Sequence, residues 1–199
     1  MSKRAPNDQS LQPVYAVDAP AGVLLAARQV PSPNFDARPP GMHADLIVVH
    51  GISLPPGEFG GPWIDRLFMN SLPPGAHPYF EQVAAMRVSA HLLIRRDGEI
   101  VQYVSFNERA WHAGRSRHGA REGCNDFSIG IELEGADDMP YSEPQYVNLA
   151  AVIRALCSAY PALSAERVVG HSDIAPGRKT DPGGSFEWAR VRALIRLQT

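Results

Sequence analysis

The sequence contains very little cysteine: Cys124 and Cys157 are the only two among 199 residues. Two cysteines are too few for the disulfide framework of a small secreted domain. They also provide no paired thiolate spacing of the kind that binds a metal. We therefore expect both to be buried free thiols.

The chain also lacks a strong charge of either sign, a long apolar run and an export signal. A net charge of -2 and a pI near 6.4 give no basic field, so neither nucleic acid nor a membrane is an expected partner. No run approaches the ~20 apolar residues of a membrane span. The polar stretch 6–10 follows Lys3 and Arg4, where a signal peptide needs an apolar segment. These absences favour a cytoplasmic protein that binds a small molecule.

The length and composition predict one domain, and its interspersed strand and helix patterns indicate the α/β class. A chain of 199 residues with 44% hydrophobic content can fill a single core, and no internal repeat is present. Residues 1–22 mix Pro, Asn, Asp, Gln and Ser, which predicts a flexible N-terminal tail. The domain is then expected to occupy residues 23–199.

Three segments have the patterns of β-strands. Residues 46–49 form a short β-branched run that ends at His50 and favours a buried central strand. Residues 128–134 alternate, which places three apolar side chains on one face and Glu132 and Glu134 on the other. Residues 89–104 predict an antiparallel hairpin, because Asp97 and Gly98 suit a tight turn.

Helical signals separate and follow these strands. Short helices are expected at 62–68 and 79–86, and Ser142 with Gln145 forms a capping box before a helix that ends at Pro161. A closing amphipathic helix is expected to direct apolar side chains inward, namely Phe186, Val191, Leu194 and Ile195. The expected architecture is a mixed central β-sheet flanked by helices.

The segment "HSDIAPGRKTDPGG", residues 171–184, concentrates polar chemistry in a stretch where Pro and Gly prevent long regular elements. Two histidines and one carboxylate are a sufficient protein shell for a catalytic zinc, and His50, His171 and Asp181 could supply it. Spacing alone leaves open interpretations in which these residues bind no metal. Either histidine could be an ordinary hydrogen-bonded side chain, as we expect for His91, and Asp181 could be a turn residue before Pro182.

Four stretches in order resemble a known family: "VVHGISLPPGEFGGPWID", "RVSAHLLIRRDGEIVQYV", "NDFSIGIELEG" and "GHSDIAPGRKTDPG". They are similar to the type 2 N-acetylmuramoyl-L-alanine amidases. Within that family the chain resembles the cytoplasmic enzymes that cleave 1,6-anhydro-N-acetylmuramyl peptides during cell-wall recycling. The resemblance extends from about residue 23 to residue 196, and it implies a zinc amidase domain that acts on anhydro-muropeptides.

The resemblance also implies roles for individual residues. The zinc ligands of the family fall on His50, His171 and Asp181, its acidic catalytic residue on Glu132, and its lysine on Lys179. Amide hydrolysis needs an activated water, a proton acceptor and positive charge beside the developing oxyanion. Without the resemblance, Glu132 would read as a solvated acid and Lys179 as a surface cation.

Substrate contacts follow from the same resemblance. Arg87 and Arg178 are candidates to bind the carboxylates of the peptide, and Trp111 is a candidate apolar wall. Surface salt bridges for the two arginines and core packing for Trp111 remain open alternatives. Residue 51 is Gly where close relatives are expected to have Asn, which removes a side-chain hydrogen bond to the substrate.

Three other functions compete with a cytoplasmic monomeric amidase. A non-catalytic muropeptide-binding module typically lacks part of the ligand set, whereas His50, His171, Asp181, Glu132 and Lys179 are all present here. An amidase acting on intact peptidoglycan would be exported, which the missing signal peptide disfavours. A structural zinc site would need a fourth protein ligand, and no Cys or further His lies in the ligand stretches.

Overall fold

A six-stranded sheet with parallel and antiparallel neighbours forms the centre of the protein. The computed structural model describes residues 12–197, in which the strand order is β12, β5, β11, β6, β7, β3. β11 is parallel to both β5 and β6, β12 is parallel to β5, and β6 and β7 are antiparallel. Their bounds are β3 (Arg28–Gln29), β5 (Leu46–Ile52), β6 (Leu92–Ile94), β7 (Ile100–Gln102), β11 (Ser128–Glu134) and β12 (Val168–Gly170).

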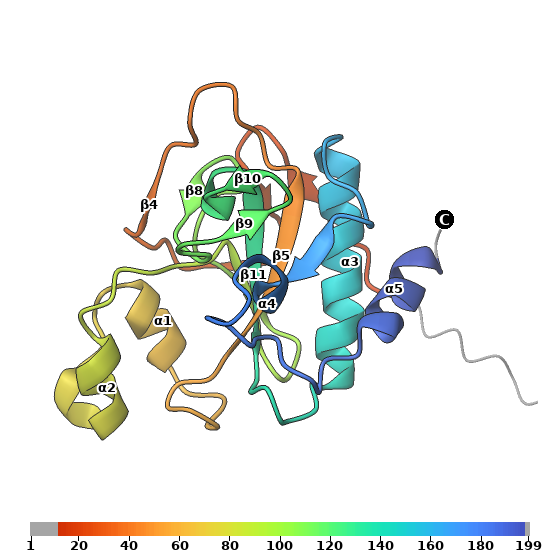
Figure 1. Ribbon diagram of the computed structural model, residues 1–199. Coiled ribbons are helices and arrows are strands. Elements are labelled where there is room, and N and C mark those ends of the chain that lie inside the picture. Colours follow the sequence, from red (N-terminus) through yellow and green to blue (C-terminus); the bar gives the residue numbers. More distant parts are fainter. Residues whose placement is uncertain (1–11, 198–199) are drawn as a thin grey trace, which may run out of the picture.

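Helices pack on both faces of this sheet (Figure 1). The long helix α3 and the closing helix α5 share one core cluster, whereas α1 and α2 belong to a second cluster with β6 and β7. The bounds are α1 (Trp63–Phe68), α2 (Pro78–Val83), α3 (Glu143–Ala159), α4 (His171–Ile174) and α5 (Trp188–Arg196), with 3-10 turns η1 (Pro74–Ala76) and η2 (Cys124–Asp126). The predicted mixed sheet flanked by helices is confirmed.

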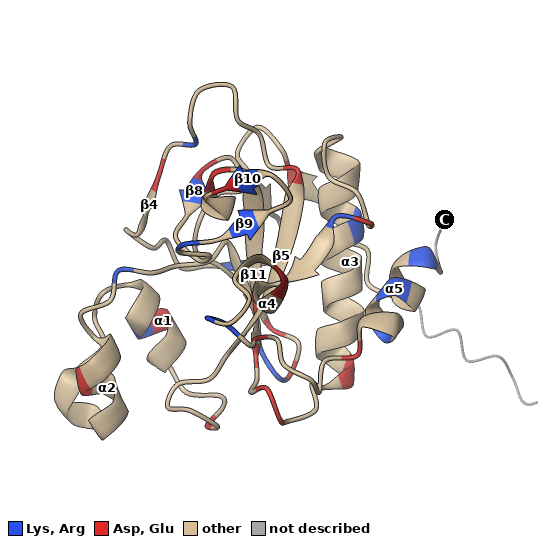
Figure 2. Cartoon of the chain, viewed as in Figure 1, with Lys and Arg blue, Asp and Glu red and all other residues tan. Residues whose placement is uncertain are grey.

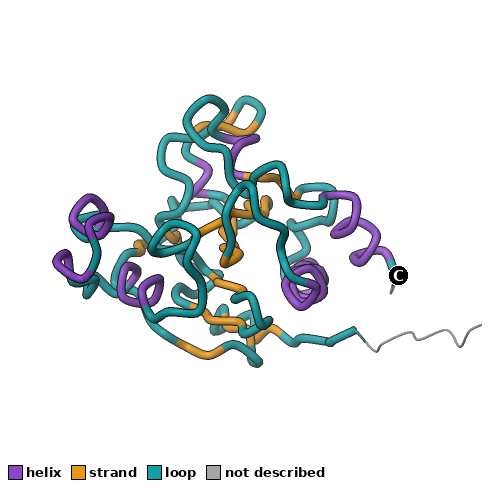
Figure 3. The backbone as a smooth tube through the Cα atoms, turned by 90° about the horizontal axis from the view of Figure 1, so that it is seen from below, coloured by secondary structure: helices purple, strands orange, loops and turns teal. Residues whose placement is uncertain are grey.

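Three small antiparallel ribbons surround the main sheet. They pair β1 (Val17–Asp18) with β2 (Val23–Leu24), β4 (Phe35–Asp36) with β8 (Arg109–Ala110), and β9 (Arg117–His118) with β10 (Arg121–Glu122). Seen from below, helices lie on both sides of the central strands (Figure 3). Basic and acidic positions are interspersed among these elements (Figure 2). Within residues 12–197, every helix is too short or too polar to cross a membrane.

The alternation predicted for residues 128–134 separates packing from chemistry. The apolar side chains of β11 and β5, such as Ile131 and Val49, join the cluster that α3 covers. Glu132 and Glu134 alternate with them and therefore point to the opposite face. All seven residues of β11 are nevertheless buried, so the polar face is enclosed by protein instead of lying open to solvent.

Most predicted boundaries agree with the structure to within a few residues. The hairpin turns at Gly98, whose φ of 94° explains the glycine, and Ser142 and Gln145 form the capping box of α3. The second short helix ends at Val83, three residues before the predicted end. Cys124 is buried and Cys157 is half-buried, and both are free thiols.

The second half of the predicted N-terminal tail lies within the described residues. Residues 1–11 lie outside the described residues, but residues 12–22 pack on the domain. Val17 and Tyr15 contact the main core cluster, and the Tyr15 hydroxyl donates to Asn148 Oδ1 at 2.9 Å. Tyr15 and Val17 thus attach this part of the segment to the domain, and the boundary at residue 22 stays a prediction.

A buried histidine, His91, and a half-buried arginine, Arg38, lie beside β11. Arg38 donates to the carbonyls of residues 106, 125, 126 and 128, and His91 Nδ1 accepts from the Gly130 amide at 3.0 Å. Burial, with Arg38 adding to it, lowers the pKa of His91 to about 3. His91 is therefore the structural histidine that we expected.

We expect His91 to make the fold sensitive to acid. An unfolded histidine binds a proton with a pKa near 6.5, whereas folded His91 binds one only near 3. The unfolded state therefore gains protons first, and stability falls as the pH drops from about 6.5 toward 3, by at most about 1.4 kcal/mol per pH unit. The melting temperature of the wild type should fall more steeply across this range than that of His91→Asn. Parallel curves for the two proteins would contradict the assignment.

Candidate active site

Three adjacent parallel strands carry the predicted catalytic side chains to one place. Glu132 on β11 is the register partner of His50 on β5, and His171 directly follows β12, on the other side of β5. Strands that run in the same direction end at the same edge of a sheet. The sheet register therefore brings together residues that are far apart in the sequence.

The three predicted metal ligands converge on one point. His50 Nδ1 lies 3.0 Å from His171 Nδ1, and Asp181 Oδ2 lies 3.3 Å and 3.0 Å from these two nitrogens. A tetrahedral zinc site with bonds of ~2.0–2.1 Å separates its ligand atoms by roughly 3.3 Å. The donor spacing fits a zinc ion.

The protonation of the histidines supports the same fit. Burial lowers the pKa of His50 to about 4, so this imidazole is neutral at pH 7. His171 Nε2 lies 3.2 Å from the Ala113 carbonyl, which can only accept, so this nitrogen carries the proton. The other ring nitrogen of His171, Nδ1, faces His50 and Asp181. Two imidazoles and one carboxylate are a donor set that zinc binds.

Glu132 is a buried carboxylate that faces the same cleft. It is 8% exposed, and its Oε2 atom has no hydrogen-bond partner within residues 12–197. Burial, with Asp181 adding to it and Lys179 opposing it, raises the pKa of Glu132 well above its ordinary value. A carboxylate with a raised pKa holds a proton more readily than an exposed one, which suits a group that transfers protons.

The cleft around these residues has a volume of about 490 Å³, within the range of small-molecule sites. Its floor contains His50, Glu132, His171 and Asp181, and Lys179 lies at its exposed side. Half-buried Trp111 lines the cleft and donates through Nε1 to Asp36 at 3.2 Å. The rest of the wall is largely apolar, with Leu67, Phe68, Tyr79, Val83 and Met86.

The two arginines predicted to bind substrate lie outside this lining. Exposed Arg87 donates to the carbonyls of residues 85 and 86, next to the cleft wall. Exposed Arg178 donates to the carbonyls of Ala113 and Arg115, each at 2.7 Å, and lines a neighbouring hollow. Their role as anion clamps therefore stays a prediction.

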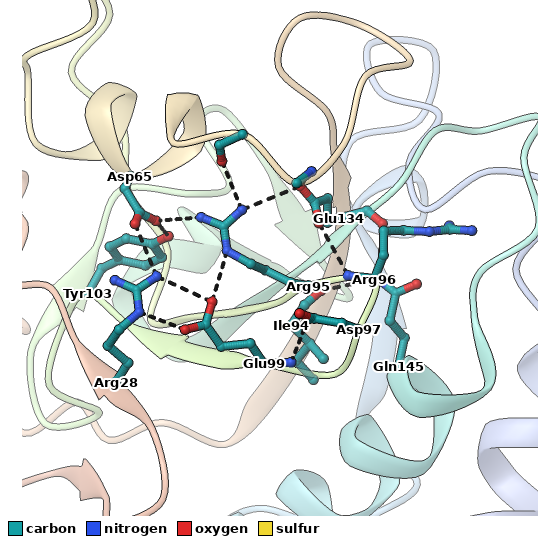
Figure 4. A network of polar contacts seen from close by, with 12 residues as sticks. Arg28, Asp65, Ile94, Arg95, Arg96, Asp97, Glu99, Tyr103, Glu134 and Gln145 are labelled. Carbon is teal, nitrogen blue, oxygen red and sulfur yellow. Dashed lines mark hydrogen bonds and ion pairs between the residues drawn. The ribbon is translucent and has the colours of Figure 1, made fainter.

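A network of ion pairs holds the loop 53–61 at the rim of the cleft (Figure 4). Glu134 Oε1 accepts from the Gly60 amide at 2.7 Å, and Arg95 lies 3.4 Å from the same oxygen. Arg95 also pairs with Asp65 of α1 and with Glu99. The carboxylate two residues beyond Glu132 thus anchors one end of the loop to the sheet.

The glycine at position 51 makes room for a buried tyrosine. A Cβ atom at residue 51 would overlap the hydroxyl of Tyr141. Tyr141 is 5% exposed and donates to the Pro182 carbonyl at 2.9 Å, next to Asp181. Gly51, in place of the expected Asn, therefore leaves the space in which the Tyr141 hydroxyl bonds to the ligand loop.

Replacing Gly51 with Asn is expected to destabilise the protein, because the new Cβ displaces Tyr141 from Pro182. Overpacking of this kind costs about 1–3 kcal/mol. The double variant Gly51→Asn with Tyr141→Phe removes the overlapping hydroxyl and should recover part of the loss. Chemical denaturation of the wild type, both single variants and the double variant measures this coupling, and strictly additive effects would refute it.

His112 is a residue of this site that the sequence analysis missed. Its Nδ1 atom lies 2.9 Å from His50 Nε2, and its ring fills the space above Gly130. The motif "AWHAG" drew attention only to Trp111, and the contact joins residues 62 positions apart. The absence of a side chain at Gly130, between Ile129 and Ile131, is the one local signal that something packs against this strand.

Comparison with known proteins assigns the family. The N-acetylmuramoyl-L-alanine amidase family matches residues 40–184, a span that contains all the residues of the cleft. The chain belongs to this family. The resemblance to type 2 amidases is thus confirmed.

Individual members of the family match over nearly the whole chain. The 1,6-anhydro-N-acetylmuramyl-L-alanine amidase AmpD of Escherichia coli K12 is 61% identical over 178 residues, covering 89% of this chain and 97% of the relative. The AmpD protein of Haemophilus influenzae is 49% identical over 179 residues, covering 90% of this chain and 97% of the relative.

Solved structures of family members have the same fold. A crystal structure of a selenomethionine derivative of AmpD superposes with a TM-score of 0.86 at 63% identity, covering 88% of this chain and 97% of the other. The amidase AmiD of Escherichia coli, in complex with anhydro-N-acetylmuramic acid-L-Ala-D-gamma-Glu-L-Lys, superposes with a TM-score of 0.57 at 25% identity. That match covers 79% of this chain and 60% of AmiD.

Proposed function

We propose that this protein is a zinc-dependent amidase of cytoplasmic peptidoglycan recycling. It hydrolyses the amide bond between the lactyl group of 1,6-anhydro-N-acetylmuramic acid and the L-alanine of the stem peptide. The observation that carries the proposal is the convergence of His50, His171 and Asp181 beside the buried Glu132 in one cleft. The AmpD relatives, whose names state this substrate, support it over almost the full chain.

His50, His171 and Asp181 would hold the zinc ion, which when bound acidifies a water molecule and polarises a carbonyl group. Glu132 accepts a proton from the attacking water and returns it to the departing L-alanine nitrogen. Its burial and raised pKa suit both roles. As the C–N bond breaks and a C–O bond forms, the products are a free stem peptide and a sugar with a lactyl carboxylate.

Lys179 supplies positive charge at the exposed side of the cleft. Its ammonium group stabilises the oxyanion that develops on the amide carbonyl in the tetrahedral intermediate. A lysine is not a ligand while it is protonated, so this charge acts in addition to that of the metal. Lys179 precedes Asp181 by two residues, which keeps the cation beside the ligand cluster.

The substrate is a small molecule whose sugar and peptide bind along the cleft. Trp111 offers a flat apolar surface to one of these parts, and the carboxylates of the peptide reach the exposed guanidinium groups of Arg87 and Arg178. The AmiD complex with an anhydromuramyl tripeptide supports a ligand of this class for the family. One chain contains every proposed catalytic group, so a monomer is sufficient for the proposed reaction.

Mass spectrometry of an anhydro-muropeptide incubated with the purified protein tests the proposal. Free peptide and anhydro-muramyl sugar should form with the zinc-loaded protein, disappear with a chelator, and form again after zinc is restored. Recovery of intact ligand from folded, zinc-loaded protein would leave a binding module and refute the amidase. Faster cleavage of polymeric peptidoglycan than of the soluble anhydro-muropeptide would refute the recycling substrate.

A further inference from the structure

A chain of buried hydrogen bonds leads from His50 away from the cleft. His50 Nε2 lies 2.9 Å from His112 Nδ1, and His112 Nε2 lies 3.2 Å from Ser128 Oγ. Ser128 Oγ lies 2.6 Å from the carbonyl oxygen of Cys124. His50, His112 and Ser128 are 1%, 9% and 0% exposed, so these groups have little access to water even though both histidines line the cleft.

The last acceptor in this chain determines the direction of every bond. A carbonyl oxygen can only accept, so the Ser128 hydroxyl donates its single proton to Cys124. Ser128 Oγ must then accept from His112 Nε2, which leaves a lone pair on His112 Nδ1. That lone pair accepts from His50 Nε2, and the lone pair of His50 is left on Nδ1.

The Nδ1 atom of His50 is the one that lies next to the other two predicted ligands, at 3.0 Å from His171 Nδ1 and 3.3 Å from Asp181 Oδ2. We propose that His112 and Ser128 are positioning residues for the metal centre, which hold His50 in the tautomer whose Nδ1 lone pair points to His171 and Asp181. This inference rests on the proposed function and adds to it two residues that do not touch the metal. The opposite tautomer would place a proton between the ligand atoms and two facing lone pairs between His50 and His112.

Two features of the fold place His112: a glycine leaves space for its ring, and an asparagine binds its backbone. A side chain at Gly130 would collide with the His112 ring, so the bare strand position allows the ring to lie flat against β11. Asn125 Oδ1 accepts from the amides of both His112 and Ala113, at 3.2 Å and 2.8 Å. The Ala113 carbonyl also orients His171. By binding the backbone of residues 112 and 113, Asn125 therefore supports both predicted histidine ligands.

Outer partners of metal ligands typically change metal affinity by about 10- to 100-fold when they are removed. We therefore expect His112→Phe, which keeps a ring but loses the acceptor, to raise the zinc dissociation constant by about that factor. His112→Asn places an amide oxygen where Nδ1 was and should recover part of the affinity. Ser128→Ala should weaken zinc binding less, because it frees the His112 tautomer without removing the ring.

The test is the zinc dissociation constant of the full chain, measured by competition with a chromophoric chelator. A double variant of His112→Phe with Ser128→Ala should bind zinc as weakly as His112→Phe alone, since Ser128 acts only through His112. His91→Asn is the matched control, because it removes a buried imidazole that bonds to neither ligand, and it should keep wild-type affinity. Nitrogen-15 NMR of the imidazoles should find the proton on Nε2 in both His50 and His112.

Wild-type zinc affinity in both His112→Phe and Ser128→Ala would overturn the inference, as would a proton on Nδ1 of His50 in the zinc-loaded protein. If His112→Phe does not fold, Ser128→Ala and the NMR measurement still decide. A folded wild type that binds no zinc would instead refute the proposed function, and the inference with it. Tight zinc binding by the wild type, together with weaker binding by His112→Phe and Ser128→Ala but not by His91→Asn, supports both the proposed function and this inference.

Discussion

Glu132→Gln is expected to lower kcat by about 10²- to 10⁴-fold, the usual contribution of a general acid and base. The amide has the shape of the carboxylate but cannot take a proton from the attacking water. Zinc content should stay at the wild-type level, because Glu132 is not one of the three clustered donors. Thermal stability should not fall, since the substitution removes a buried carboxylate oxygen that has no partner within the described chain.

Glu134→Gln is the matched control for this experiment. It makes the same chemical change two residues further along β11, but this carboxylate contacts Arg95 and the Gly60 amide instead of the reacting groups. We expect a lower melting temperature, from the loss of a buried ion pair, with kcat retained. Full turnover by zinc-loaded Glu132→Gln would remove Glu132 from the mechanism.

Asp181→Asn is expected to weaken zinc binding by more than about 100-fold, since even an outer partner is worth 10- to 100-fold. The amide preserves the size of the side chain but changes the net charge of the donor set from -1 to zero. A ligand that binds only the folded state raises the melting temperature. Added zinc should therefore raise the melting temperature of the wild type and leave that of Asp181→Asn nearly unchanged.

Asp137→Asn separates ligand loss from a general change of charge. Asp137 also lines the cleft, but its carboxylate is not part of the donor cluster formed by His50, His171 and Asp181. This variant should keep the zinc-dependent rise in melting temperature and most of the metal content measured by elemental analysis. Equal zinc affinity in Asp181→Asn and the wild type would show that the metal, if bound, is held elsewhere.

Sequence patterns were sufficient for the parts of this protein that depend on neighbours along the chain. The alternation in residues 128–134 predicted both faces of β11, and the capping box at Ser142 predicted the start of α3. The loop at 171–184 could be recognised because its Pro and Gly residues exclude a long helix or strand. The resemblance to the family then selected Glu132 and Lys179, which periodicity alone would have left as surface charges.

The features that the sequence did not predict depend on contacts between distant segments. His112 gains its place from the gap above Gly130, and Gly51 is explained by Tyr141. The anchoring of residues 12–22 depends on Tyr15 reaching Asn148 on α3, 133 positions away. No local pattern encodes such contacts, because the geometry of the sheet decides which side chains meet.

The parallel pairing of β5, β11 and β12 has a consequence for how the protein acquires its site. His50 and His171 are 121 positions apart, and they meet only after two long crossovers have closed. Pairings of this range are slow to form, since the entropy of closing the loops is lost before the contacts reward it. A nascent chain on the ribosome therefore cannot assemble the cleft until residue 181 has emerged. The ligand cluster therefore depends on the long-range contacts of the sheet, which form late in folding compared with local helices and turns.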